Sequence, residues 1–153
     1  MLRRLGVPED TLLDVQSSLA CTYGELGQLE ESLSIERDVY SGWVRLNGEE
    51  HRSTLLAAHN YAVMLKGLKR FEEAKSVLRK MMPVARRVLG DNHEETLKMR
   101  WHYAMSLHLD PTATLDDLRE AVTTLEDVER IARRVFGGAH PLTETIDSEL
   151  EKT

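Results

Sequence analysis

"RRVLGDNHEETLKMRWHYAM", residues 86–105, is the stretch that decides the fold, because its outline occurs again on both sides. Upstream, residues 44–63 read "VRLNGEEHRSTLLAAHNYAV". Downstream, residues 133–146 read "RRVFGGAHPLTETI". Self-similarity at a fixed period indicates a chain built from repeated units, each too small to bury its apolar face alone.

Three alanines set the register of the repeat. Ala20, Ala62 and Ala104 lie 42 residues apart, since 62 − 20 and 104 − 62 both equal 42. Each has a leucine seven places before it, a large residue just before it and another three places after it. These residues are Leu13, Leu19 and Tyr23, then Leu55, Tyr61 and Leu65, then Leu97, Tyr103 and Leu107. The offsets are helical and predict one buried stripe, with an alanine where two helices approach closely.

A second helix follows the first in each unit. In the first two units its packing position, Ser32 or Ala74, comes twelve residues after the alanine of the first helix. In the third unit the equivalent Ala121 comes 17 residues after Ala104, and the five extra residues fall in "LDPTATLDD", residues 109–117. Pro111 favours a loop there. We therefore expect one domain over residues 1–153, with helix-pair units at about 5–45, 46–88 and 89–135 and a polar capping helix at 140–151.

A glycine and then a histidine mark each joint between units. The glycines are Gly48, Gly90 and Gly137, and the histidines are His51, His93 and His140. Glycine suits the left-handed turn that ends a helix, and Pro141 suits the first position of the next helix. As a set the histidines resemble metal ligands, but a whole repeat separates them. We therefore interpret them as helix-capping residues and expect no metal site.

Composition narrows the functional classes. The chain has 153 residues, 41% apolar and 30% charged, with a formal net charge of −6, which argues against nucleic acid as a partner. No apolar run approaches the ~18 residues of a membrane-spanning helix, so we expect no membrane insertion. The single cysteine, Cys21, favours a reducing compartment, and the cytoplasm is the default location because no targeting signal is visible. "LRRLG", residues 2–6, resembles the end of an earlier repeat, as in a piece of a longer protein.

Catalytic motifs are missing from the sequence. It contains no glycine-rich phosphate loop, Gly-x-Ser-x-Gly elbow or Cys-x-x-Cys pair. His102 and His108 are six residues apart, which places them on different faces of a helix. Cys21 is the remaining candidate nucleophile, and we interpret it as a small residue of a periodic helix. We predict no catalytic residue and no cofactor, so the protein is not expected to be an enzyme.

These features together resemble the tetratricopeptide repeat, in the 42-residue form of kinesin light chains. "VLGDNHEETL" (88–97) and "FGGAHPLTET" (136–145) are similar to the linker of that family, and "HNYAVMLKGLKRFEEAKSVL" (59–78) is similar to its helix pair. The resemblance covers roughly residues 5–150. The sequence departs from the family pattern at Lys69, where the family has the turn glycine, and at Ser32, where it has a packing alanine. The asparagine two places before the anchoring alanine is kept as Asn60, but Ser18 and His102 replace it in the other two repeats.

The resemblance implies an all-α, right-handed solenoid of stacked helix pairs, about three repeats plus a C-terminal capping helix. It also implies a protein–protein interaction module whose first helices line a concave groove. Carried onto this chain, the groove positions are Asp14, Ser17, Cys21 and Gly24, then Leu56, His59, Val63 and Lys66, then Lys98, Trp101, Met105 and His108. Asn60 corresponds to the residue that hydrogen-bonds a ligand backbone.

Trp101 and Met105 form a second apolar strip one turn apart, beside the repeat stripe. Such a tryptophan is a candidate anchor for a partner protein. Alternatively, the loop at 109–117 or the next helix folds over it.

The sequence is consistent with two functions. One is an adaptor that binds a mostly apolar peptide, so that Trp101→Ala would abolish binding with the fold intact. The other is a subunit permanently docked in a larger assembly. Repeats can also stack end to end, so an oligomer is a further possibility.

Overall fold

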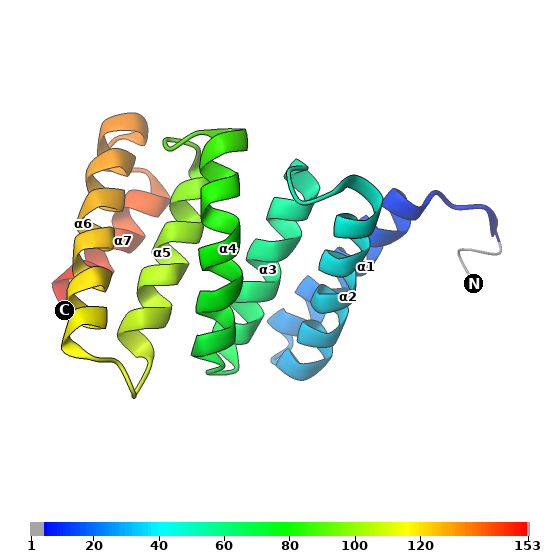
Figure 1. Ribbon diagram of the computed structural model, residues 1–153, viewed down its shortest axis with the longest axis horizontal. Coiled ribbons are helices and arrows are strands. Elements are labelled where there is room, and N and C mark those ends of the chain that lie inside the picture. The colour runs from blue at the N-terminus through cyan, green and yellow to red at the C-terminus, as the bar shows by residue number, and fades with distance from the viewer. Residues whose placement is uncertain (1–4, 153) are drawn as a thin grey trace. The chain divides into compact units, whose positions relative to one another are not determined.

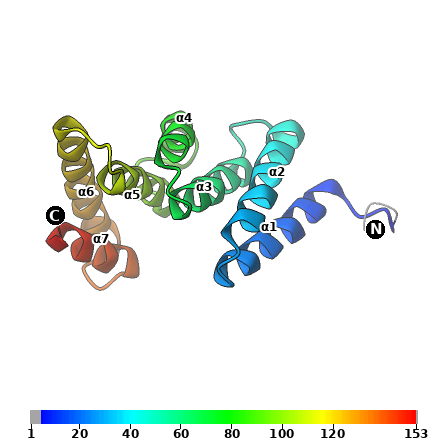
Figure 2. The same ribbon diagram turned by 90° about the horizontal axis from the view of Figure 1, so that it is seen from below.

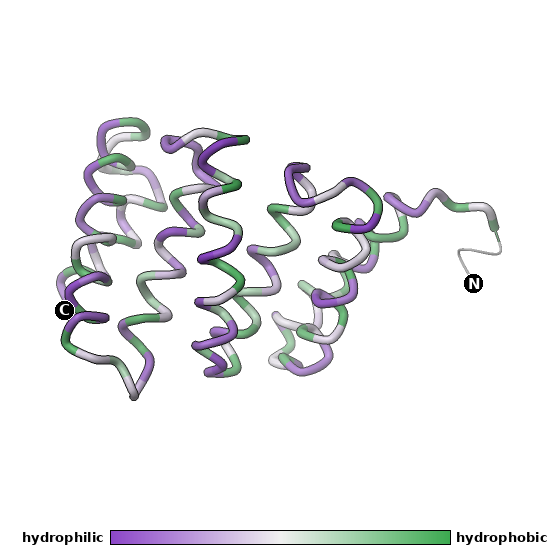
Figure 3. Tube along the Cα trace, viewed as in Figure 1, coloured by the Kyte–Doolittle hydropathy of each residue, from purple (hydrophilic) through white to green (hydrophobic). Residues whose placement is uncertain are grey.

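The computed structural model describes residues 5–152, and the regular structure in that part of the chain is helical throughout (Figure 1). The helices are α1 (Glu9–Glu25), α2 (Leu29–Asn47), α3 (Arg52–Gly67), α4 (Phe71–Leu89), α5 (Glu94–Leu109), α6 (Leu115–Phe136) and α7 (Pro141–Lys152). Apolar and polar residues both occur along every helix (Figure 3). The all-α prediction is confirmed, and α7 is the predicted C-terminal helix.

The chain divides into two compact units, residues 1–70 and residues 71–153, here called the N-terminal and C-terminal units. In the N-terminal unit α2 packs against both α1 and α3. In the C-terminal unit α5 packs against α4 and α6, and α7 packs against α6. Figures 1 and 2 show this order within each unit. The predicted repeat at 46–88 contains α3 and α4, one helix from each unit, and the repeat boundaries stay predictions.

The alanine register is confirmed by burial. Ala20, Ala62 and Ala104 are fully buried, as are the leucines seven places before the second and third of them. Leu19 is the exception, since 47% of it is exposed. It lies on α1, which packs chiefly against α2, whereas its equivalent Tyr103 lies on α5, which packs against two helices.

The joints between successive repeats have the helix-capping geometry that the sequence predicts. The histidine Nδ1 atoms accept hydrogen bonds from the backbone N–H two residues on, at 3.2 Å for His51, 3.1 Å for His93 and 3.2 Å for His140. The preceding glycines Gly48, Gly90 and Gly137 have φ of 80°, 99° and 89°. Each histidine therefore satisfies an otherwise unpaired N–H of the next helix.

Two departures from the repeat pattern have local explanations. Lys69 adopts a φ of 60°, close to the 78° of Gly27 in the first repeat. The same left-handed turn therefore forms in both repeats, although a lysine adopts this conformation less readily than a glycine. Ser32, in the place of a packing alanine, is buried and donates its hydroxyl to the Ala20 carbonyl at 2.8 Å. The extra polar atom is thus satisfied within the helix contact.

The loop at residues 110–114 fixes the start of α6. Asp110 accepts hydrogen bonds from the Thr112 backbone N–H at 2.9 Å and from the Thr112 hydroxyl at 2.8 Å. Thr114 and Asp117 then form a reciprocal capping box at the first turn of α6. Lys75 of α4 pairs with Asp110 at 3.1 Å, and both residues are buried. The five extra residues of the third repeat thus form a loop, as predicted, and hydrogen bonds and an ion pair hold this loop in place.

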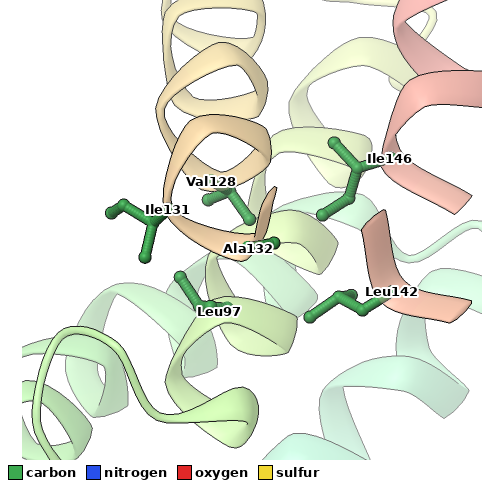
Figure 4. Close-up of a cluster of buried hydrophobic side chains, with 6 residues drawn as sticks. All are labelled: Leu97, Val128, Ile131, Ala132, Leu142 and Ile146. Atoms are coloured by element: carbon green, nitrogen blue, oxygen red, sulfur yellow. The ribbon is translucent and has the colours of Figure 1, made fainter. Parts of the chain in front are cut away.

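Apolar clusters hold each unit together. In the C-terminal unit, Leu97 of α5 meets residues of α6 and α7 in one buried cluster (Figure 4). The other members are Val128, Ile131 and Ala132 of α6 and Leu142 and Ile146 of α7. In the N-terminal unit the cluster consists of Leu13, Val39, Trp43 and Ala57. The short α7 thus covers apolar surface that α5 and α6 would otherwise expose.

Candidate functional site

The α3 strip, defined as Leu56, Asn60 and Val63, consists of predicted site residues of α3 that are exposed or half-buried. Offsets of four and seven residues place the three side chains on one face of α3. Leu56 is 48% exposed, and Asn60 and Val63 are half-buried. Lys66 is half-buried one turn further on, whereas His59, another predicted groove residue, is buried. The strip presents apolar surface on both sides of an amide.

Asn60 has hydrogen-bonding capacity left over. No hydrogen bond joins its side chain to another residue within the part of the chain that the structure describes. A side-chain amide combines two N–H donors with a carbonyl acceptor, so it can bond to both the N–H and the C=O of an extended backbone.

The groove positions of the first repeat form a less apolar surface. Asp14 and Cys21 are exposed, and Ser17 is half-buried. Gly24 lies close to α3, since a Cβ built on it would be 3.5 Å from the Met64 sulfur. The end of α1 therefore reaches α3 within the N-terminal unit, beyond the C-terminal end of the α3 strip.

Glu36 is a buried carboxyl group behind this surface. It is 1% exposed and accepts a hydrogen bond from the Ser17 hydroxyl at 3.3 Å. Its Oε2 atom has no hydrogen-bond partner among residues 5–152. Burial raises the pKa of Glu36 to about 7, and the Ser17 bond opposes that shift. Sequence reasoning missed Glu36, because a glutamate on an amphipathic helix has no signal that separates it from a surface charge.

Cys21 is a free thiol whose pKa is raised by its surroundings. It is exposed and unpaired with any other cysteine. Partial burial raises the pKa of the thiol, and the negative charges of Glu36 and Glu25 raise it further. Since the thiolate is the nucleophilic form, these neighbours disfavour the chemistry that a catalytic cysteine needs.

The groove positions of α5 are more covered than those of α3. Trp101 is half-buried and packs against the apolar cluster of α5, α6 and α7. Met105 is buried, and Lys98 is paired with Glu94 at 3.0 Å on the same helix. His108 is half-buried. This packing is the one expected for the alternative in which the next helix folds over Trp101, and the role of Trp101 as a partner anchor stays a prediction.

Other kinds of site find no support within residues 5–152. No group of His, Cys, Asp and Glu in that range is arranged to hold a metal ion. None of its helices combines the length and the apolar character that crossing a bilayer requires.

Solved structures with the same fold include repeats of a kinesin light chain. The crystal structure of nearly identical TPR-like repeats from a Podosopora anserina kinesin light chain has a TM-score of 0.81 at 24% identity, covering 92% of this chain and 64% of that one. A single-substitution variant of the same repeats has a TM-score of 0.83 at 23% identity, covering 95% and 66%. BtubC from P. vanneervenii has a TM-score of 0.58 at 13% identity, covering 95% and 64%. The chain therefore spans about two thirds of the length of each.

The sequence profile of the tetratricopeptide repeat matches residues 12–53 and 54–95. A search of curated proteins finds no match. The two matched segments are consecutive, each of 42 residues, and together they cover more than half of the 153 residues. The chain belongs to the tetratricopeptide repeat family.

Proposed function

We propose that the α3 strip binds an extended, mostly apolar peptide segment of another protein. Repeats of this family generally serve in protein–protein interaction, which is the class of function that membership implies. In the proposed complex Asn60 bonds the peptide backbone, while Leu56 and Val63 contact its side chains. Lys66 extends the contact at the C-terminal end of the strip.

The observation that carries this proposal is an exposed leucine beside an asparagine with no hydrogen bond of its own among the described residues. Large apolar side chains contribute binding energy when a partner covers them, and a polar group beside them fixes orientation. Trp101 and Met105, which are packed in the C-terminal unit, are not needed for this contact.

The proposal is tested by selecting displayed peptides on the full chain and measuring their affinity for variants. We expect Asn60→Ala to weaken binding about tenfold, because two backbone hydrogen bonds of about 0.5–1.5 kcal/mol each are lost. Leu56→Ala should also weaken binding, whereas Leu109→Ala, which removes an exposed leucine from α5, should not. Equal affinity for wild type and Asn60→Ala would rule out the α3 strip as the binding surface.

The exposed apolar residues of α1 favour a second candidate, a subunit docked permanently in an assembly. The α1 strip consists of Val15 and Leu19 of α1 and of Leu26, which directly follows the helix, and all three are large apolar residues exposed to solvent. Forty-two residues further on, the equivalent of Val15 is Ala57, which is buried in a cluster with Val39 and Trp43 of α2. Val15 thus occupies a position that another helix covers in the following repeat, and the exposed α1 strip suits a stably bound helix.

We propose the cytoplasm as the location of the protein. Cys21 is an exposed free thiol, and the cytoplasm is a reducing compartment in which such thiols persist.

A further inference from the structure

A pocket of about 360 Å³ lies between α4, α5 and α6 of the C-terminal unit. It is lined by Arg79, Met82, Pro83 and Arg86 of α4, Arg100 and Tyr103 of α5, and Glu120 and Thr124 of α6. The lining holds three arginines and one glutamate, and two of these arginines are ion-paired with aspartates outside the lining, Arg86 with Asp91 and Arg100 with Asp127. Arg79 forms no such pair among residues 5–152, so the pocket offers an anion one unpaired cation in a chain whose net charge is −6.

Arg100 gives the pocket a rigid cation. It is only 7% exposed, and its Nη2 donates to Asp127 of α6. A guanidinium has five N–H donors in a fixed plane, so this one bond orients the group and leaves donors for a ligand. Arg86 is more exposed and forms an ion pair with Asp91 at 3.2 Å.

Arg79 has no carboxylate within ion-pair distance among residues 5–152. Its Nε donates to the hydroxyl oxygen of the buried Tyr103 at 3.1 Å, and its guanidinium lies over the Tyr103 ring, 5.5 Å from the centroid. Tyr103 in turn donates to Glu120 at 2.8 Å. The tyrosine holds Arg79 in place, and the negative charges of Glu120 and Glu72 act on Arg79 from beyond ion-pair distance, so the guanidinium keeps N–H donors for a carboxylate.

Pro83 places a backbone acceptor beside this cation. A proline inside a helix has no N–H, so the carbonyl four residues earlier, that of Arg79, lacks its usual helical hydrogen bond. An extended segment lying along α4 could donate a backbone N–H to this carbonyl. Met82 and Pro83 supply apolar surface for the neighbouring side chains of that segment.

We propose that this pocket binds a glutamate or aspartate side chain in an extended segment of another protein, with its carboxylate on Arg79 and Arg100. The bidentate match between guanidinium and carboxylate favours this group. Glu120 at the same pocket disfavours a second negative charge, so a carboxylate fits better than a phosphate. The inference goes beyond the proposed function, because it concerns other helices and the other compact unit.

The test is an NMR titration of the isotope-labelled full chain with the peptide acetyl-Ala-Leu-Glu-Leu-Ala-amide and its glutamine analogue. We expect the glutamate peptide to shift the signals of Arg79, Arg100 and Tyr103, and the glutamine peptide to bind at least fivefold more weakly. Arg79→Ala should weaken the glutamate peptide at least fivefold. Arg37→Ala, which removes an exposed arginine of α2, is the matched control and should have no effect.

Glu120→Gln tests the same site without removing a binding group. It keeps an acceptor for Tyr103 and removes the repelling charge, so we expect severalfold tighter binding of the glutamate peptide. Asn60→Ala should leave this binding unchanged, which separates the pocket from the α3 strip. Equal binding of the two peptides, unshifted Arg79 signals, or stronger competition by inorganic phosphate than by acetate would each overturn the proposal.

Discussion

Replacing Leu97 with alanine is expected to lower the free energy of unfolding of the C-terminal unit by about 3 kcal/mol, within the range for a fully buried leucine. Leu97 is completely buried where α5 meets α6 and α7 (Figure 4). Alanine removes apolar contacts and leaves a cavity between three helices. Because α7 is a short helix that packs through this cluster, it loses much of its attachment.

The measurement is a urea titration followed by tryptophan fluorescence. Trp43 belongs to the apolar cluster of the N-terminal unit, and Trp101 packs against that of the C-terminal unit. A Trp43→Phe background therefore makes Trp101 the reporter of the C-terminal unit. The control is Leu109→Ala, at an exposed leucine of the same helix, which should change stability by less than about 0.5 kcal/mol. A loss for Leu97→Ala no larger than that of the control would mean that α7 does not complete a core.

Replacing Glu36 with glutamine is expected to stabilise the N-terminal unit by about 2 kcal/mol at pH 8, after allowance for solvent screening, and to have little effect at pH 5. Burial raises the pKa of Glu36 to about 7 from an ordinary value of 4.5. The folded state thus binds the proton more tightly than the unfolded state. The raised pKa therefore adds to the free energy of unfolding in full below about pH 4.5, where the carboxyl group is protonated in both states. This contribution is lost as the pH rises through 7, where the folded state must ionise the buried group.

Urea titrations between pH 5 and pH 8 in a Trp101→Phe background, with Trp43 as the reporter, measure this difference. Glu31→Gln is the matched control, because Glu31 is exposed in the first turn of the same helix. Its effect should be small and nearly independent of pH. Parallel pH profiles for wild type and Glu36→Gln would show that Glu36 remains ionised in the fold.

The fold could be predicted from the sequence because each repeat carries its own local signals. The buried alanines at 42-residue intervals fixed the helix faces, and the Gly and His residues fixed the joints. These signals act within a few residues of one another, through helix periodicity and helix capping. Pro111 similarly located the loop that holds the extra residues of the third repeat.

The surface was harder to predict, because exposure depends on which helices pack together. Trp101 has the spacing of a free apolar strip, yet it packs against the cluster that α6 and α7 complete. Leu19 has the spacing of a core residue, yet it is exposed on α1. In both cases the periodic pattern of one helix gave no information about its neighbours in space.

The charged pocket and the buried Glu36 were missed for a related reason. Arg79 and Arg100 belong to different helices, and Tyr103, which orients Arg79, lies in the predicted core stripe. Glu36 is buried on α2, and its hydrogen bond to Ser17 of α1 spans 19 residues. Such pairings arise from tertiary packing, and no short sequence motif predicts them.

The most direct test of the proposed function is photo-crosslinking of a peptide selected on the wild-type chain. A photoreactive phenylalanine analogue is introduced in place of Leu56 on the α3 strip and, in a separate variant, in place of Val15 on the α1 strip. We predict a crosslink from position 56 that Asn60→Ala abolishes, and none from position 15. A crosslink from position 15 alone would contradict the peptide site on α3 and would favour the docked subunit.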